Sequence, residues 1–399
     1  MNLRHAKPLA FTLLALTLSA CRSRDFPQYP PNYREYAYVT NGDSGTVTVL
    51  DVVNVRLDRE LPVGRNPVAV TASPTRNEVY VVNSGAENAE GSISVINAEN
   101  NTVAATIPVH RRPVSIDLDA EGTLAYVANS GSNSISVLDL KARREIAQIG
   151  AGEEPVAARI APDGKTLVVA NRTGNSVSII DPAGFIDPAR RNPAQSVRAV
   201  FEGCPGPSDI VILPDLSKAF VACAAGHQLM VIALAIAKVH PGQPDRLESF
   251  LDVGRAPVQL ALKPDGGELF VSNSLSNSIS EIYASTDEVA GATMIGEDPV
   301  RGLVSSDNSL LYIANFHSQY VTIYAIDEGK RLPVRQGGSI RVGDGPSALA
   351  FSSSGLLLFV VDARSSDIAV VRTASRSLFT IIPTGRAPNA IAVKAFKLP

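Results

Sequence analysis

Short runs in which β-branched or aromatic residues alternate with small or polar ones recur along this 399-residue chain. The clearest unit is TLAYVANSGSNSISVLDL at 123–140, where two such runs flank the turn NSGSN. This alternation, with turn residues between the runs, predicts a β-hairpin. Seven further units of the same kind begin at residues 36, 78, 166, 219, 268, 310 and 356. The chain is therefore predicted to be all-β and repetitive.

Each hairpin is followed by a third strand that ends in an apolar residue and glycine, and then by a loop that closes on proline and a small apolar strand. One residue ends the first strand of every hairpin, and we call these eight places the ring positions: Asn41, Asn83, Asn129, Asn171, Cys223, Asn273, Asn315 and Asp362. They are 42 to 52 residues apart. Four strands per unit at this period indicate a β-propeller of four-stranded antiparallel blades. Eight complete sets predict eight blades, and a seven-bladed ring with one set displaced is the alternative.

The way the ring closes follows from the strand order. The chain begins within a blade and ends on the short strand Pro388–Val393, which lacks a blade of its own. We expect it to pair into the first blade beside Tyr38–Asn41, with Thr46–Asp51 and Asp58–Val63 outside them. Such closure removes the open sheet edge that would otherwise favour aggregation.

Several repeats carry a more specific signature. YVTN at 38–41, YVAN at 126–129 and YIAN at 312–315 occur with VGRAP and IGEDP loops and with APDG and KPDG turns. From residue 36 to about residue 394 the chain resembles the YVTN-repeat β-propeller family, which includes bacterial surface-layer and periplasmic proteins. The resemblance implies the fold and says little about chemistry, because structural repeat residues define the family.

The first twenty residues are predicted to be a targeting segment and not part of the fold. Arg4 and Lys7 precede the apolar run at 9–18, which is too short to span a bilayer comfortably. The following LSAC at 18–21 resembles a bacterial lipobox, which implies cleavage before Cys21 and acylation of that residue. An ordinary secretory signal with a coincidental cysteine is the alternative. We expect a signal peptide at 1–20, a proline-rich tether at 21–35 and one propeller domain at 36–399, with Arg22 favouring the outer membrane.

The composition narrows the class of function. A hydrophobic fraction of 45% with no Trp predicts a core of Val, Ile, Leu and Ala. A formal charge of −3 gives no electrostatic reason to expect nucleic acid as a partner. No nucleophile elbow, phosphate loop or metal-ligand motif is present, and His110, His227 and His317 belong to blades that are not neighbours. We therefore expect no catalytic residue, metal or cofactor.

Strand direction sorts the loops onto two faces. Loops inside the hairpins, and loops that join one blade to the next, lie on one face, which we call the rim face. The other connections lie on the opposite face, which we call the base face. The asparagines at the ring positions end on the rim face, and we expect a structural role for them. Asparagine tolerates left-handed backbone angles, and its side chain hydrogen-bonds the turn that follows.

Five arginines are candidates for ligand binding on the rim face. Arg386, Arg65, Arg111 and Arg112 fall in three successive blade-joining loops across the closure, and the hairpin-loop residue Arg364 is expected beside them. Together they would form a basic arc suited to a carboxylate, a phosphate or an acidic partner. A solvated rim of mixed charge is the alternative, because Glu153, Glu154, Glu297, Asp298 and Asp344 lie elsewhere around it.

Two cysteines are placed for a disulfide. The turn at 214–215 makes Pro207 and Cys223 opposite one another in a hairpin, and Cys204 lies three residues further out. This is within bridging reach, and an oxidising periplasm favours the bond. Two free thiols, with Cys223 merely replacing the ring asparagine, are the alternative.

On the base face, three connections are long: 182–195, 234–246 and 327–337. Long loops on a rigid scaffold often carry recognition, although they are also tolerated as insertions. Two of these connections, 182–195 and 234–246, belong to adjacent blades and carry four basic residues: Arg190, Arg191, Lys238 and Arg246.

These observations predict a membrane-tethered, non-enzymatic binding or scaffold protein of the bacterial cell envelope, monomeric and facing the periplasm or the cell surface. Its partner would be an envelope protein, a glycan or a small anionic ligand, and its membrane contact would be the lipid on Cys21. The alternative is a periplasmic propeller enzyme, lactonase-like or oxidoreductase-associated, with its active site at the channel mouth. A surface-coat component is a third interpretation.

Overall fold

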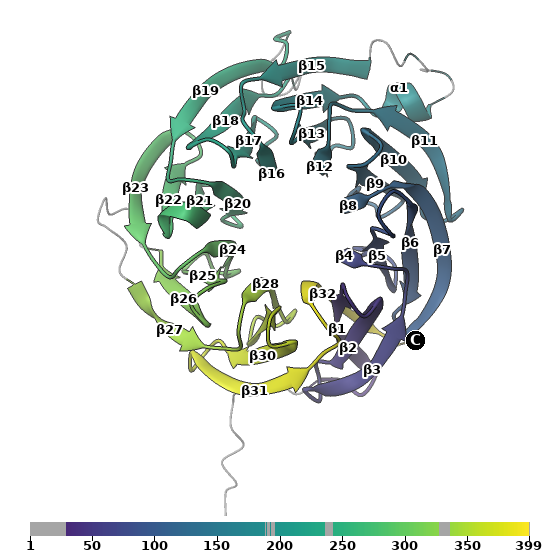
Figure 1. Ribbon diagram of the computed structural model, residues 1–399, viewed down its shortest axis with the longest axis vertical. Helices are drawn as coiled ribbons and strands as arrows, with labels where there is room; N and C mark the ends of the chain where they lie inside the picture. The colour runs from purple at the N-terminus through teal and green to yellow at the C-terminus, as the bar shows by residue number, and fades with distance from the viewer. Residues whose placement is uncertain are drawn as a thin grey trace, which may run out of the picture.

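The structure is a computed structural model that describes residues 29–187, 189, 192, 196–235, 242–326 and 336–398. Figure 1 shows eight blades arranged in a ring, each a four-stranded antiparallel sheet. The prediction of an all-β, eight-bladed propeller is confirmed. We number the blades along the chain and name their strands inner, second, third and outer.

The strands alternate in direction from the centre of the ring to its perimeter. The inner strands all begin at proline: β4 (Pro67–Ala72), β8 (Pro113–Leu118), β12 (Pro155–Ile160), β16 (Pro207–Ile212), β20 (Pro257–Leu262), β24 (Pro299–Val304), β28 (Pro346–Phe351) and β32 (Pro388–Lys397). The second strands are β1 (Tyr33–Asn41), β5 (Glu78–Asn83), β9 (Leu124–Asn129), β13 (Leu167–Asn171), β17 (Lys218–Cys223), β21 (Glu268–Asn273), β25 (Leu310–Asn315) and β29 (Leu357–Asp362).

The remaining strands complete each blade toward the solvent. The third strands are β2 (Thr46–Asp51), β6 (Glu90–Asn97), β10 (Ser134–Asp139), β14 (Ser176–Ile180), β18 (Gln228–Ala233), β22 (Ser278–Tyr283), β26 (Tyr320–Ala325) and β30 (Asp367–Arg372). The outer strands are β3 (Arg56–Pro62), β7 (Thr102–Arg111), β11 (Arg144–Gly150), β15 (Val197–Glu202), β19 (Arg246–Asp252), β23 (Glu288–Met294), β27 (Gln336–Arg341) and β31 (Ser377–Pro383). Two short helical turns occur in loops, α1 (Ala183–Ile186) and η1 (Ser274–Ser276).

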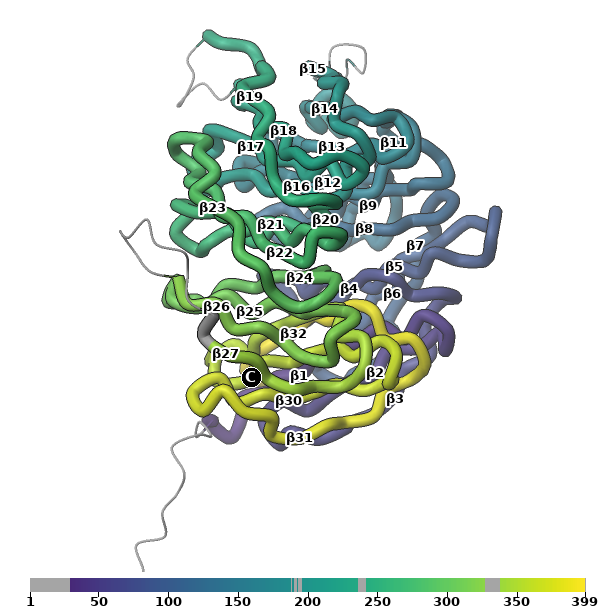
Figure 2. The backbone as a smooth tube through the Cα atoms, turned by 60° about the vertical axis from the view of Figure 1, so that its left-hand side comes forward, coloured from purple at the N-terminus to yellow at the C-terminus, as the bar shows by residue number. Residues whose placement is uncertain are grey.

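The ring closes through β32, which pairs with β1 in blade 1. Tyr38 lies opposite Ala392 and Asn41 lies opposite Pro388, so the last strand pairs beside Tyr38–Asn41, as predicted from the sequence. In Figures 1 and 2 the yellow β32 lies beside the purple strands of blade 1. Closure of this kind completes the fourth strand of blade 1 and covers the edge that β1 would otherwise expose.

The pairing in blade 1 is longer than predicted. β1 begins at Tyr33, three residues before the expected domain start at residue 36, because β32 continues to Lys397 and supplies partners for the added residues. Beyond the strands, Asn32 Nδ2 donates to the Leu398 carbonyl at 3.0 Å, and the Leu398 amide donates back to the Asn32 carbonyl at 2.9 Å. Both ends of the described chain are therefore tied together on the base face.

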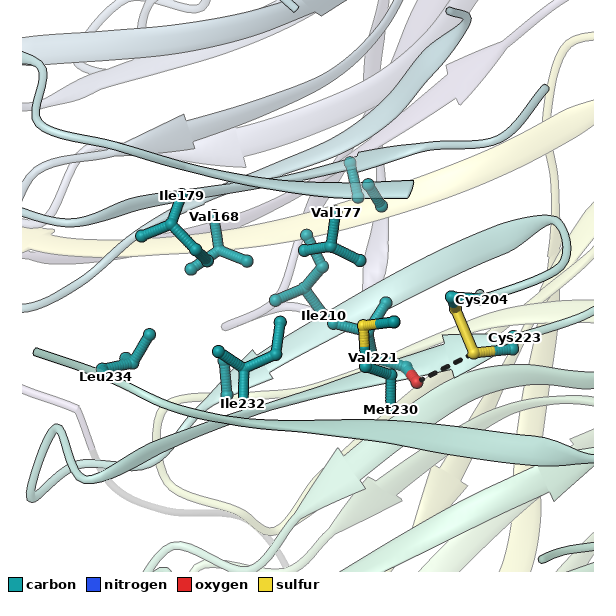
Figure 3. Packing of buried hydrophobic residues seen from close by; sticks show 13 residues of the cluster. Val168, Val177, Ile179, Cys204, Ile210, Val221, Cys223, Met230, Ile232 and Leu234 are labelled. Carbon is teal, nitrogen blue, oxygen red and sulfur yellow. Dashed lines mark hydrogen bonds between the residues drawn. A yellow bond between two sulfur atoms is a disulfide. The ribbon is translucent and has the colours of Figure 1, made fainter. Parts of the chain in front are cut away.

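The core consists of eight apolar clusters, one at each seam between adjacent blades. Figure 3 shows the seam between blades 4 and 5, where Val168 and Val177 face Ile210, Val221 and Met230. Second and third strands pack on both faces, so they are buried almost throughout. Each such side chain contributes roughly 1.5–3 kcal/mol when it leaves water, and β-branched residues suit these positions.

The ring positions have a structural role, but not through the turn. Asn129 Nδ2 donates to Ser136 Oγ at 2.9 Å, and the equivalent asparagines reach serine or threonine hydroxyls on their own third strands. The expectation of left-handed backbone at these asparagines is wrong, because they remain paired in strands. Left-handed angles occur four residues later, as at Asn133 with φ of 50°.

The glycine of each apolar-glycine pair is explained by the same ring. A Cβ atom on Gly152 would lie 2.7 Å from the side-chain amide of Asn171, and Gly64 and Gly296 are equally close to their own ring asparagines. A residue with a side chain cannot occupy this place without displacing the asparagine.

Candidate functional site

The inner strands enclose a channel cavity of about 620 Å³ at the centre of the ring. Its wall combines small apolar residues such as Ala69, Ala348 and Ala390 with the polar side chains of Arg159, Gln259 and Arg301. The cavity lies within the size range of small-molecule sites, which is roughly 300–1,000 Å³.

Five long polar side chains stand on the inner strands of five consecutive blades, and three of them, Arg159, Gln259 and Arg301, line the cavity. Asp117, Arg159, Asp209, Gln259 and Arg301 stand on β8, β12, β16, β20 and β24. Each is the second or the fourth residue after the proline that begins its strand. Side chains two residues apart share one face of a strand. All five therefore project toward the inner strand of the following blade.

Three of these residues join neighbouring blades. Asp117 Oδ2 accepts the Ile160 amide at 2.9 Å, Asp209 Oδ2 accepts the Leu260 amide at 3.1 Å, and Gln259 Oε1 accepts the Gly302 amide at 2.7 Å. An inner strand is the edge of its sheet, so its inward amides have no strand partner and need an acceptor or water. These acceptors satisfy that need across the seams.

The two arginines cannot act as acceptors and are left facing the channel. Arg159 Nη2 lies 3.5 Å from Asp209 Oδ1, with about a third of the arginine side chain exposed. Arg301 makes no hydrogen bond or ion pair with any described residue, and its side chain is exposed to the channel space although the ring surrounds it. Desolvation by the ring lowers the pKa of Arg301 from its ordinary value, and Asp209 opposes that decrease.

Burial and charge also perturb the carboxyl group at the start of this arc. Desolvation raises the pKa of Asp117, while Arg159 and the amides of Ile160 and Leu118 act in the opposite direction. Going round this side of the channel, the inner strands thus carry an acid, a base, an acid, a neutral amide and a base: Asp117, Arg159, Asp209, Gln259 and Arg301. These residues were not predicted as a site from the sequence, because they stand inside strands that were expected to be small and apolar. A charged side chain at the second or fourth residue after the proline of an inner strand is the sequence signal that indicates these residues.

On the rim face, four of the five arginines proposed as a basic arc lie on successive blade-joining loops, and Arg364 is held apart from them by blade 7. Arg65, Arg111, Arg112 and Arg386 are all exposed on successive blades. Arg112 Nη2 lies 3.6 Å from Glu154 Oε1 of the next loop, whereas the other three make no ion pair with described residues. Shallow hollows beside them are of mixed charge, with Glu87 next to Arg111 and Asp43 next to Arg65.

Arg364 points into blade 7 and not toward the other four. Its Nη2 lies 2.8 Å from His317 Nε2, and its Cζ lies 4.5 Å from the centre of the Phe316 ring. Nη1 lies 3.9 Å from Asp344 Oδ1. Arg364 is thus held within an acidic sector of the rim face.

Two histidines lie beside carboxylates that sequence spacing did not indicate. His317 Nδ1 is 2.9 Å from Asp298 Oδ2, and His110 Nε2 is 3.3 Å from Glu145 Oε1. With Arg364 donating to Nε2, we assign the imidazole proton of His317 to Nδ1. Among the described residues no group of three or more His, Cys, Asp or Glu side chains is placed to hold a metal ion.

Cys204 and Cys223 form a disulfide in blade 5, with their Cα atoms 5.0 Å apart. Cys223 occupies the ring position and lies opposite Pro207, and both cysteines are fully buried. Figure 3 places the bond at the rim end of the apolar seam. The bond ties the blade-joining loop to the second strand, in place of the ring asparagine.

Other candidate residues lie outside the described part of the chain. These are Cys21, Arg190, Arg191 and Lys238. Arg246 is described, and its Nη1 donates to Gln243 Oε1 at 2.6 Å. Among the described residues, the structure contains no helix with the length and apolar character needed to cross a membrane.

The fold defines this protein as an eight-bladed β-propeller, and comparison with solved structures agrees. The chain is similar to the dihydro-heme d1 dehydrogenase NirN (TM-score 0.69, 14% identity, covering 92% of this chain and 76% of that one). It is also similar to AztD from Citrobacter koseri (TM-score 0.66, 13% identity, 92% and 99%) and to a proposed 6-phosphogluconolactonase from Bacteroides uniformis (TM-score 0.61, 15% identity, 91% and 100%). No family model and no curated protein matches the sequence. At these identities the likeness shows the propeller fold alone.

Proposed function

We propose that this chain is a non-enzymatic, membrane-tethered binding propeller of the bacterial cell envelope, related to the YVTN-repeat proteins, and that the central channel is its recognition site. One observation supports this most directly. The channel holds a cavity of about 620 Å³ that is lined by Arg159, Gln259 and Arg301; Gln259 joins its blade to the next one through the Gly302 amide, while Arg301 stays exposed. Such a wall is fixed in shape and open to a solute.

A non-catalytic role is favoured by the chemistry of the wall. Asp117 and Asp209 each accept a backbone amide, so they are held in place and not poised over the cavity as a free acid and base. Catalysis of hydrolysis or proton transfer requires such groups to converge on a reacting atom.

A propeller enzyme is the second candidate, and a specific contact favours it. His317 and Asp298 form a pair at 2.9 Å on the rim face, with His317 about half exposed. A histidine oriented by a carboxylate is the usual arrangement of a general base, although Arg364 must leave Nε2 of His317 before that nitrogen can accept a proton from a substrate. Propellers similar in fold include the dihydro-heme d1 dehydrogenase NirN.

One experiment separates the two candidates. Purified protein is equilibrated with a small-molecule extract of envelope material, and retained and newly formed solutes are identified by mass spectrometry. The matched variants are Ala390→Trp, which fills the channel from β32, and His317→Ala on the rim face. Retention that is lost in A390W and kept in H317A supports the binding proposal. New products that depend on His317 support the enzyme, and equal retention by wild type and A390W contradicts channel binding.

The lipid anchor is tested separately. We propose acylation of Cys21, with the tether leaving from the base face, where the rings of Tyr29 and Tyr33 stack at 4.6 Å. Labelled palmitate should enter the wild-type chain and not Cys21→Ser, and the variant should leave the membrane fraction. Equal labelling of both would contradict the anchor.

A further inference from the structure

The third residue after each inner-strand proline turns its peptide groups toward the channel. Leu260 shows this most fully, because its amide donates to Asp209 Oδ2 at 3.1 Å and its carbonyl accepts Gln259 Nε2 at 2.7 Å. Both groups lie on the open edge of β20, away from β21. In an antiparallel pair, residues that are not hydrogen-bonded to their cross-strand partner have this orientation.

The same register recurs in blade 8, one blade beyond Arg301. Leu349 is the third residue after Pro346 and pairs with Val360, as Leu260 follows Pro257 and pairs with Val271. The shift of register directly after the proline is also the same in both blades. The amide of Leu349 therefore faces the channel, and no described side chain accepts it.

The residue that stands before Leu349 is Arg301. It occupies the place from which Asp209 reaches Leu260 and Gln259 reaches Gly302 in the two preceding blades. A guanidinium only donates, so it cannot accept the Leu349 amide. Two donors, one of them charged, thus line the same cavity, and no described side chain accepts a hydrogen bond from either.

The next blades leave space in front of these donors. At the position of Arg301 they carry Ala348, Ala390 and Ala69, and all three line the cavity. Arg159, on β12, adds a second positive charge to the channel, and it acts on Arg301 electrostatically. Asp209 lies between the two arginines along the ring and holds Arg159 at 3.5 Å.

We propose that Arg301 and the Leu349 amide form an oxyanion site inside the channel, which binds the carboxylate or phosphate group of a small solute, with Arg159 as the second cation. A guanidinium and a backbone amide are the donors that such groups prefer, and enclosure strengthens their interaction. The inference rests on the proposed function, because it names the class of ligand for the same channel.

The variant that tests the site is Arg301→Gln. Glutamine at this place should accept the Leu349 amide as Gln259 accepts that of Gly302, so the fold is kept and both donors are removed from the cavity. Arg386→Gln, which neutralises an exposed arginine on the rim face, is the matched control. Thermal melting checks that both variants are folded.

Binding is measured by titration calorimetry at low ionic strength, with charged probes and their neutral twins. Succinate is compared with succinamide, and glycerol 3-phosphate with glycerol, so that the carboxylate and phosphate arms are separate. We expect at least one charged probe to bind more tightly than its twin, R301Q to weaken it at least tenfold, and R386Q to change it less than twofold.

The inference is overturned if neither charged probe is preferred over its twin, or if R301Q binds as the wild type does. Retention of envelope solutes by the wild type, lost in A390W and unchanged in R301Q, would overturn the anion site and leave channel binding standing. Absence of any A390W-sensitive retention would instead remove the proposed function itself.

Discussion

In blade 8 Asp362 lies directly opposite Asp367 across the β29–β30 pair, at a ring position where six other blades pair an asparagine with hydroxyl groups. Two carboxylates cannot share this contact without a proton. Burial, followed by the Asp367 charge and hydrogen bond, raises the pKa of Asp362 to about 8, although the Gly343 amide opposes the shift.

This pair should make stability depend on pH. The pKa of Asp362 is higher in the folded chain than the value of about 3.9 in an unfolded one, so folding takes up a proton between these values. The contribution is fully present below about pH 4 and is lost as the pH rises through about 8. The variant Asp362→Asn lacks this proton. Its free energy of unfolding, relative to that of wild type, should therefore be higher at pH 9 than at pH 5 by ~2–4 kcal/mol. Denaturant unfolding across pH measures this difference. Asn129→Asp is the control and should create a similar pH dependence in blade 3; a D362N profile parallel to wild type would contradict the shared proton.

Glu281 should be a second source of instability at high pH. It stands on the third strand of blade 6 where the other blades have Val or Ile, such as Val231 and Ile323. Burial, then the charge of Glu268, raises its pKa, against the effects of Lys263 and Tyr324. Since a raised carboxyl pKa costs stability as the pH rises, Glu281→Val should raise the free energy of unfolding by about 1–2 kcal/mol at pH 8 and by less at pH 4. Glu281→Gln separates charge from shape, because it should reproduce the pH dependence of the gain without the added apolar packing.

The disulfide should contribute to stability through the loop that it closes. Cys204 and Cys223 are 19 residues apart, and a bridge across a loop of this size contributes about 3 kcal/mol in the chain-entropy description. The double variant C204S/C223S should have a free energy of unfolding lower by that amount, and its midpoint of denaturant unfolding should fall accordingly. Addition of a reducing agent should lower wild-type stability and leave the variant unchanged. If wild type and the double variant have equal stability without reducing agent, the disulfide does not contribute to stability.

The last strand should be required for folding of the whole ring. Deletion of residues 388–399 removes β32 and leaves the edge of β1 unpaired in the centre. We expect loss of a single cooperative unfolding transition, together with concentration-dependent aggregation measured by light scattering. Deletion of residues 398 and 399 alone keeps every β1–β32 pair, and it should preserve the transition. Cooperative folding of the longer deletion would contradict this role.

The exposed arginines of the rim face should matter for binding and not for stability. The triple variant R65Q/R111Q/R386Q changes side chains without ion pairs among the described residues, so stability should change by less than ~0.5 kcal/mol. If the rim face also binds an acidic partner, the variant should weaken that binding and reduce its dependence on salt. Unchanged binding and salt dependence would remove these arginines as a site.

The fold was predictable because its signals are local and repeated. Four-stranded blades were predicted from the turn residues, the proline that begins each inner strand and the spacing of the ring positions. Closure of the ring was predicted from the strand at Pro388, which had no blade of its own. The start of β1 at Tyr33 was not predictable, since residues 33–35 are ordered by the far end of the chain and carry no alternation of their own.

The candidate sites were harder to predict for a geometric reason. Whether Arg159 or Arg301 faces a core or a channel depends on the neighbouring blade, which no single repeat encodes. The contact of Arg364 with His317 likewise crosses a seam between blades 7 and 8. The asparagine hydrogen bonds to third-strand hydroxyls were missed because the turn between the two strands offered a nearer partner.

The hydrogen bonds between Asn32 and Leu398 bring the two ends of the described chain to one spot beneath the ring. An affinity tag, a bead or a sensor chip coupled through either of these ends would consequently hold the molecule in the same orientation. Both ways of immobilising it would present the eight hairpin tips to the solution, and a ligand should give matching signals from either preparation.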